Sequence, residues 1–171
     1  KINGTADLIF ANILGMTISI LTIFPDMVGE ILSYGLIGRA IKKGVLAINP
    51  VDLRNFTTDK HRSVDDRPFG GGPGMVMRVD VVDRALQGLR DKGQGLRGRR
   101  ENVKIVLLSP RGKLFSQEIA QGYSTLDHLI LISGRYEGVD ERVKEHLADE
   151  ELSIGNYVLS GGEIPAMAVA D

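Results

Sequence analysis

The stretch VKIVLLSPRGK, residues 103–113, decides the fold class. Its first part, Val103–Leu108, is apolar and rich in β-branched residues, which predicts a buried strand. The SPRG that follows at 109–112 predicts a loop at the end of that strand. A helix predicted over Ser116–Tyr123 and a second apolar strand, Leu129–Ile132, come next along the chain. Strand, helix and strand in this order predict an α/β domain with a mostly parallel sheet.

The alternation of strands and helices continues on both sides of this unit. Apolar residues recur at helical spacing from Met27 to Ile41, and Lys42-Lys43-Gly44 predicts the end of that helix. Residues 54–74 show no regular period, so they predict a long loop of the kind that is usually functional or disordered. The remaining predicted elements are strands at Thr17–Phe24, Val45–Leu53 and Leu152–Leu159, and helices at Val79–Arg90, Val139–Leu147 and Glu163–Val169.

The composition narrows the possible classes of site. A chain of 171 residues is long enough for one hydrophobic core. It contains no cysteine, which excludes disulfides and cysteine-zinc sites, and its three histidines are far apart in sequence. The net charge of -1 means that a nucleic-acid partner would need a local basic patch. The basic segment Arg90–Arg100 could contact phosphates, although a solvated surface run is the slightly favoured interpretation.

The N-terminal part contains a charge-free segment, Leu8–Pro25, which could indicate a signal peptide or a membrane span. Polar residues such as Asn12 and Ser19 dilute it, and Lys1 is the one cation upstream. We therefore interpret Leu8–Leu14 as a short apolar extension that abuts a buried strand, within an N-terminal extension of residues 1–15. The sequence predicts a soluble protein of a reducing, cytoplasmic compartment, with no membrane partner.

Glycine-bearing segments follow three of the predicted strands. They are Ser109–Gly112, Ser133–Gly138 and Ser160–Glu163. Because ligands of α/β sheets bind at the carboxyl ends of the strands, neighbouring strands would bring these segments into one pocket. The pocket would suit a ligand with an adenine, a ribose and an amino-acid-like tail, and no dinucleotide or P-loop motif is present. The alternative is that the glycines are turn residues of an ordinary sheet.

The segment TTDKHRSVDDRPFGGGPG, residues 57–74, mixes both charges with glycine. It is either a substrate-facing loop or a solvated surface loop, and composition does not separate the two. Its Asp65-Asp66-Arg67 cluster could hold a metal or pair with a base. Adjacent aspartates are, however, more often helix caps or partners in local salt bridges.

The sequence resembles the bacterial tRNA (guanine-N1) methyltransferases from Met16 to Asp171. The matching stretches are ILTIFPDM, YGLIGRAIKKG, DKHRSVDDRPFGGGPGMVM, LLSPRGK, SGRYEGVDERV and SIGNYVLSGGEIPAM. The resemblance implies a SPOUT-class α/β fold: a mostly parallel sheet, flanking helices and a deep C-terminal trefoil knot. It also implies a homodimer that uses S-adenosylmethionine to methylate the tRNA guanine just 3′ of the anticodon.

The resemblance assigns roles to individual residues. Glu137 and Arg135 are the catalytic candidates within this chain, and Glu137 could also contact a divalent ion such as magnesium. The implied substrate-binding residues are Asp65, Arg67, Pro73 and Gly74. The implied cofactor-binding residues are Leu107, Leu108, Ser109, Pro110, Gly134, Tyr136, Glu137, Gly138, Ile154, Gly155, Tyr157, Val158, Leu159, Gly161, Gly162 and Pro165.

The chain departs from the family pattern at two places. Asn156 stands where the family usually has aspartate. The family also continues past the position of Asp171 into a helical domain, and its presumed general base and a neighbouring arginine lie in that part. We therefore expect this chain to bind the cofactor and to be weakly active or inactive by itself. The alternatives are a cofactor-binding or dimerisation fragment without activity, and a SPOUT methyltransferase of ribosomal RNA.

Overall fold

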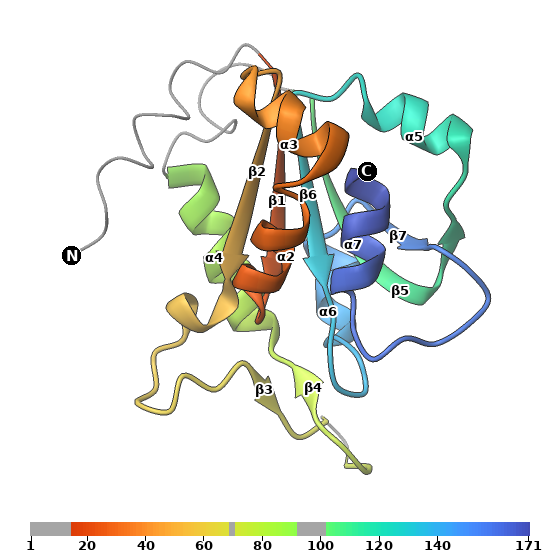
Figure 1. Cartoon of the computed structure of the whole chain (residues 1–171). Helices are drawn as coiled ribbons and strands as arrows, with labels where there is room; N and C mark the ends of the chain where they lie inside the picture. The colour runs from red at the N-terminus through yellow and green to blue at the C-terminus, as the bar shows by residue number, and fades with distance from the viewer. Residues whose placement is uncertain (1–14, 69–70, 92–101) are drawn as a thin grey trace.

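The computed structural model describes residues 15–68, 71–91 and 102–171 (Figure 1). The interpretation of residues 1–15 as an extension therefore lies outside the described residues, apart from Gly15. Most of the basic segment Arg90–Arg100 lies outside them as well. Within the described ranges, no helix has the length and apolar character needed to cross a bilayer.

A five-stranded sheet forms the centre of the molecule. Its strand order is β2-β1-β6-β5-β7, and all neighbouring strands pair in parallel. This arrangement confirms the predicted α/β class with a mostly parallel sheet. The strands are β1 (Met16–Thr22), β2 (Leu46–Asp52), β5 (Val103–Leu114), β6 (His128–Ser133) and β7 (Glu150–Ser153).

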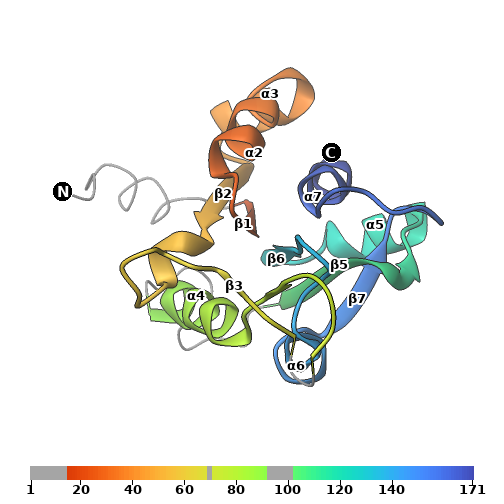
Figure 2. The same cartoon turned by 90° about the horizontal axis from the view of Figure 1, so that it is seen from below.

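Helices cover both faces of the sheet and create a separate apolar core on each. One face carries α2 (Pro25–Ile31), α3 (Gly35–Lys42), α5 (Gln117–Tyr123) and α7 (Glu163–Ala170), as Figure 2 shows. The other face carries α4 (Val79–Asp91) and α6 (Glu141–His146). Strand β6 is buried along its whole length because both layers pack on it. The C-terminal knot stays a prediction.

The single helix predicted from Met27 to Lys43 is wrong, because α2 and α3 are separate helices. The chain leaves the first helix at Ser33, whose hydroxyl donates to the Glu30 carbonyl over 2.6 Å. Gly35 then adopts a φ of 64°, a left-handed conformation that favours glycine and interrupts a right-handed helix. The helix end predicted at Lys42-Lys43-Gly44 is confirmed, and it is the end of α3.

Strands β5 and β7 differ from their predicted lengths. Leu108 and Lys113 of β5 both pair with Leu152, so residues 109–112 bulge out of the ladder before the strand resumes. The predicted strand Leu152–Leu159 is wrong beyond Ser153, where β7 ends. There the Ser153 hydroxyl exchanges hydrogen bonds with the backbone of Gly155, which turns the chain.

The long loop predicted at residues 54–74 contains short regular pieces. A 3-10 turn, η1 (Leu53–Phe56), begins it, and β3 (Asp65–Asp66) pairs antiparallel with β4 (Val76–Met77). The loop therefore leaves the sheet after β2 and returns before α4 as a hairpin-like segment (Figure 1). We call residues 57–68 and 71–78 of this segment the arm. This arm projects beyond the sheet at the end where β1 and β6 terminate.

Candidate functional site

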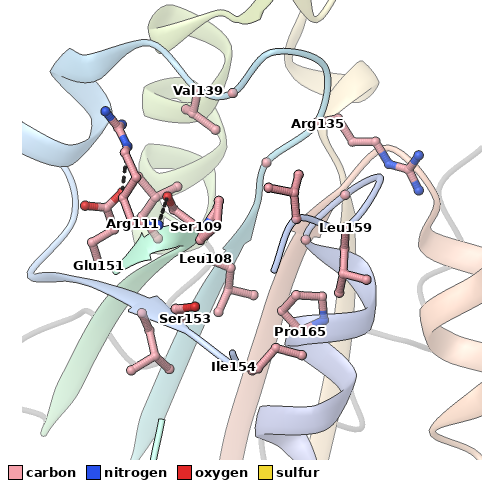
Figure 3. Close-up of a pocket in the computed structure, with 18 of the residues that line it drawn as sticks. Leu108, Ser109, Arg111, Arg135, Val139, Glu151, Ser153, Ile154, Leu159 and Pro165 are labelled. Atoms are coloured by element: carbon pink, nitrogen blue, oxygen red, sulfur yellow. Dashed lines mark hydrogen bonds and ion pairs between the residues drawn. The ribbon is translucent and has the colours of Figure 1, made fainter. Parts of the chain in front are cut away.

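A cavity of about 520 Å³ lies at the carboxyl ends of β5, β6 and β7 (Figure 3). These three strands are neighbours in the sheet, so the segments that follow them meet at one edge. The bulge at residues 109–112, the loop after Ser133 and the irregular segment after Ser153 supply most of the walls. The convergence predicted from the order of strands and loops is therefore present in the structure.

The cavity wall contains every residue that the sequence singled out for cofactor binding. Eight further residues also line it: Arg111, Arg135, Val139, Glu141, Glu151, Leu152, Ser153 and Ser160. Leu108, Ile154, Leu159 and Pro165 form an apolar side of the cavity (Figure 3). The segment 157–162 also lines the cavity, although it follows no regular strand, since β7 ends at Ser153.

Paired charges lie at another side of the cavity. Arg111 donates to Glu141 over 2.9 Å, and this hydrogen bond raises the pKa of Arg111 and lowers the pKa of Glu141. A second carboxylate at this side is that of Glu151, whose side chain is 8% exposed. Lys144 Nζ lies 3.1 Å from Glu151 Oε2. Glu151 Oε1 is 3.8 Å from Arg111 Nε and accepts no hydrogen bond from any residue that the structure describes. This side of the cavity therefore offers a buried acceptor beside an exposed arginine.

Backbone hydrogen bonds join the cavity to the arm that carries the predicted substrate-binding residues. The amide of Met77 donates to the Gly138 carbonyl, and the amide of Glu137 donates to the Met75 carbonyl, each over 3.0 Å. A Cβ on Gly74 would lie only 2.2 Å from Glu137 Cγ, which places Gly74 directly against that side chain. The arm and the loop after β6 are thus in direct contact beside the cavity.

The four predicted substrate-binding residues do not themselves line the cavity. Asp65 pairs with Met77 in the arm, and its charge, second to burial, raises the pKa of Tyr136. Arg67 and Pro73 are exposed on the arm. The predicted substrate-binding residues therefore lie on the arm outside the cavity, whereas the cofactor candidates line it.

Arg78 fastens the base of the arm to helix α4. It donates to both carboxylate oxygens of Asp80, over 3.0 and 2.8 Å, and to the carbonyl of Ser63 over 3.2 Å. A second arginine, Arg84, also donates to Asp80. These hydrogen bonds lower the pKa of Asp80 from 3.8 to about 2, with Arg78 as the main cause. The arm is therefore held by charge-assisted hydrogen bonds at its root.

The two catalytic candidates have different environments. Glu137 is exposed, and its carboxylate has no hydrogen-bond or ion-pair partner within the described part of the chain. Arg135 instead donates through Nε to Glu163 over 3.0 Å, and its side chain points away from the apolar wall in Figure 3. Glu137 is thus free to meet a ligand, whereas Arg135 has only its terminal nitrogens available.

The chain matches one protein family along nearly its whole length. The family described as tRNA (Guanine-1)-methyltransferase TrmD matches residues 16–171. Two relatives named tRNA (guanine-N(1)-)-methyltransferase, from Koribacter versatilis and Heliobacterium modesticaldum, are 50% and 51% identical over 91% of this chain. A solved structure, the tRNA (m1G37) methyltransferase from Aquifex aeolicus, superimposes with a TM-score of 0.80 at 38% identity. That superposition covers 92% of this chain and 67% of the other.

The matched region is a part of those relatives. This chain covers 58% of the Koribacter protein and 57% of the Heliobacterium protein.

Proposed function

The chain belongs to the tRNA (guanine-1)-methyltransferase family, and on that premise we propose that its cavity binds S-adenosylmethionine for methylation of tRNA. The reaction would transfer the methyl group to N1 of the guanine 3′ of the anticodon. The observation that supports this proposal is that all the residues implied as cofactor ligands line a single cavity. These residues come from segments as far as 58 residues apart in sequence, from Leu107 to Pro165.

The cavity fits this cofactor in size and chemistry. A volume of about 520 Å³ lies within the roughly 300–1,000 Å³ of typical small-molecule sites. Leu108, Leu159 and Pro165 offer an apolar wall for an adenine ring, and the glycine-bearing loops offer backbone amides and carbonyls. When bound there, S-adenosylmethionine supplies an electrophilic methyl group on its sulfonium.

The mouth of the cavity would receive the guanine. Guanine N1 carries a proton at neutral pH, and a base must remove it before the nitrogen becomes a good nucleophile. We assign Glu137 the role of orienting the guanine through N1 and N2. Its carboxylate is free of other partners in the described chain and lies against Gly74 of the arm.

Arg135 would provide positive charge beside the guanine. As N1 loses its proton, negative charge develops on O6, and a nearby cation stabilises it. The terminal nitrogens of Arg135 make no hydrogen bond to a described residue, so they remain available for O6 or for a phosphate.

Binding of a divalent ion such as magnesium is a further proposal, and we assign the ion no step in the methyl transfer. The described residues include no group of three or more histidine, cysteine, aspartate or glutamate side chains that could hold a metal. Magnesium often keeps several waters and binds one or two carboxylates together with substrate phosphates. Glu137 is the carboxylate that could contact such an ion at the entrance.

A homodimer in the cytoplasm is the assembly that we propose. The support is an exposed apolar surface on α2 and α3, which we call the α2–α3 face. Its largest members are Met27, Ile31, Tyr34 and Leu36, and the last two are 70% and 73% exposed. A surface of that kind on a small domain is typical of an interaction site.

The test combines cofactor binding with methyl transfer. Calorimetry measures S-adenosylmethionine binding, and a single-turnover assay uses a tRNA with guanine after its anticodon beside one with adenine there. We expect saturable binding and at most weak methylation by this chain, confined to the guanine-containing tRNA. Binding with no detectable turnover would favour a cofactor-binding or dimerisation unit, and turnover on ribosomal RNA instead would favour the other SPOUT alternative.

A further inference from the structure

Glu163 is a buried carboxylate that neither cofactor chemistry nor guanine orientation uses. It opens helix α7 directly after the glycine loop at 161–162, and its side chain is 1% exposed. Both of its oxygens are occupied. Thr22 donates to Oε1 over 2.8 Å from the end of β1, and Arg135 donates to Oε2 over 3.0 Å from the loop after β6.

The guanidinium of Arg135 is held on a second side. Its central carbon lies 4.6 Å from the ring centroid of Phe24, a cation-π distance. The amide of Phe24 in turn donates to the Thr22 hydroxyl over 2.9 Å. Glu163, Thr22, Phe24 and Arg135 therefore form a closed network, which we call the Glu163 network. It connects β1, the loop after β6 and the start of α7.

The cavity loops are built around this network. A Cβ on Gly161 would lie 2.3 Å from Arg135 Nε and 2.6 Å from Glu163 Oε2, so only glycine leaves room for the pair. The next amide, that of Gly162, donates to the Gly134 carbonyl over 2.8 Å. This backbone hydrogen bond joins the two glycine loops of the cavity to each other, immediately beside the ion pair.

Stability alone does not explain a charged pair at this place. The desolvation of a buried carboxylate offsets much of its attraction to an arginine, and apolar residues of similar volume often stabilise a fold as well. A charged, hydrogen-bonded pair does fix geometry, because each partner must sit where its hydrogen bonds are made.

We propose that Glu163 is a positioning residue: acting through Arg135, it holds residues 134–138 and 160–162 in the arrangement that binds the cofactor. Its role in cofactor binding rests on the proposed function, since it concerns the same cavity. The fixing of the two loops by the Glu163 network does not depend on any ligand.

The first measurement is amide hydrogen exchange of the ligand-free chain. In Glu163→Ala, we expect protection of the Gly162 amide to fall about tenfold, because the hydrogen bond to Gly134 loses its support. Glu163→Gln keeps the shape and can accept from Arg135 while donating to Thr22, so protection should fall much less. Ser19→Ala is the matched control, since it removes a buried long-range contact, to His128 over 2.9 Å, away from the cavity.

The second measurement is the calorimetric Kd for S-adenosylmethionine. We expect Glu163→Ala to raise the Kd about tenfold, Glu163→Gln about threefold, and Ser19→Ala not at all. If Glu163 acts through Arg135, then Glu163→Ala should add nothing in an Arg135→Ala background. Should Glu163→Ala not fold, Thr22→Val removes one partner of the carboxylate and Thr22→Ser retains it, so that pair gives the same comparison.

The outcomes separate the inference from the proposed function. A wild-type chain that binds no S-adenosylmethionine overturns the proposed function, while the exchange of the Gly162 amide still decides whether Glu163 fixes the loops. Unchanged Gly162 protection in Glu163→Ala overturns the inference even if the cofactor binds. Additive effects of Arg135→Ala and Glu163→Ala on the Kd would contradict the proposal that Glu163 acts through Arg135.

Discussion

The carboxylate of Asp80 helps to hold the arm in place, because its partner Arg78 also donates to the Ser63 carbonyl at the root of the arm. Hydrogen bonds from Arg78 and Arg84 lower its pKa from 3.8 to about 2. A carboxylate with a lowered folded-state pKa stabilises the fold above its unfolded pKa and loses that effect as the pH falls. The contribution is thus complete above about pH 5 and declines toward pH 2.

Asp80→Asn should consequently lower the free energy of unfolding at pH 7 by about 1 kcal/mol, a figure reduced for the partial exposure of the pair. The difference between the two proteins should shrink from pH 5 to pH 3. Urea unfolding at several pH values measures it. The control is Asp83→Asn on the same helix, where the carboxylate accepts from the neutral side chain of Gln87. A difference that stays constant with pH would contradict this account of Asp80.

Single residues also mark the limit of what the sequence predicts about the site. Gly134 and Gly138 could be assigned to a pocket because they follow a strong apolar strand at the expected end of the sheet. The ion pair of Arg135 with Glu163 could not be predicted, because the two residues are 28 apart in sequence and meet only when a loop and a helix pack together. Glu151 and Glu141 likewise reach the cavity only through the tertiary packing of β7 and α6.

At the scale of elements, helix α5 is anchored to strand β7 by one hydrogen bond. The Tyr123 hydroxyl donates to Glu150 over 2.5 Å. Burial and this carboxylate both raise the pKa of Tyr123, so the hydroxyl stays protonated as a donor at neutral pH. The cap of the same helix is predictable from sequence: Ser116 accepts from the Ile119 amide, as its position before the helix indicates.

Tyr123→Phe should lower the free energy of unfolding by about 1–2 kcal/mol, because Glu150 loses a donor. The affinity for S-adenosylmethionine should not change, since neither residue lines the cavity. Chemical denaturation and calorimetry on the same preparation measure both quantities. Tyr34→Phe, at an exposed tyrosine, serves as the control. A loss of cofactor affinity in Tyr123→Phe would show that the β7 edge and the cavity are coupled.

Elements were predictable wherever local patterns alone determine them. The apolar runs of β1, β5 and β6 gave correct strands, and Lys42-Lys43-Gly44 gave a correct helix end. The predictions failed where Gly35 interrupts a helical pattern, where a side chain competes with the backbone ladder, and where a strand resumes after a bulge. Ser153 ends β7 through its own hydrogen bonds, and the pairing of Lys113 with Leu152 depends on a neighbouring strand.

At the scale of the whole molecule, the α2–α3 face should be the contact between two copies. Leu36→Glu places a charge at its most exposed aliphatic residue and should shift the equilibrium toward monomer. Sedimentation equilibrium measures the change. Leu114→Glu, at a residue of β5 that is 60% exposed and lies outside this face, is the control. A wild-type chain that is monomeric at high micromolar concentration, or equal effects of the two substitutions, would count against this interface.

The most direct test of the account is a calorimetric titration of this chain with S-adenosylmethionine, beside two variants at exposed aliphatic positions. Leu159→Glu puts a charge on the apolar wall of the cavity, while Val45→Glu makes the same change outside it. We expect saturable binding to the wild type, binding about tenfold weaker or more in Leu159→Glu, and wild-type affinity in Val45→Glu. No binding to the wild type, or the same affinity in all three proteins, would contradict the claim that this cavity holds the cofactor.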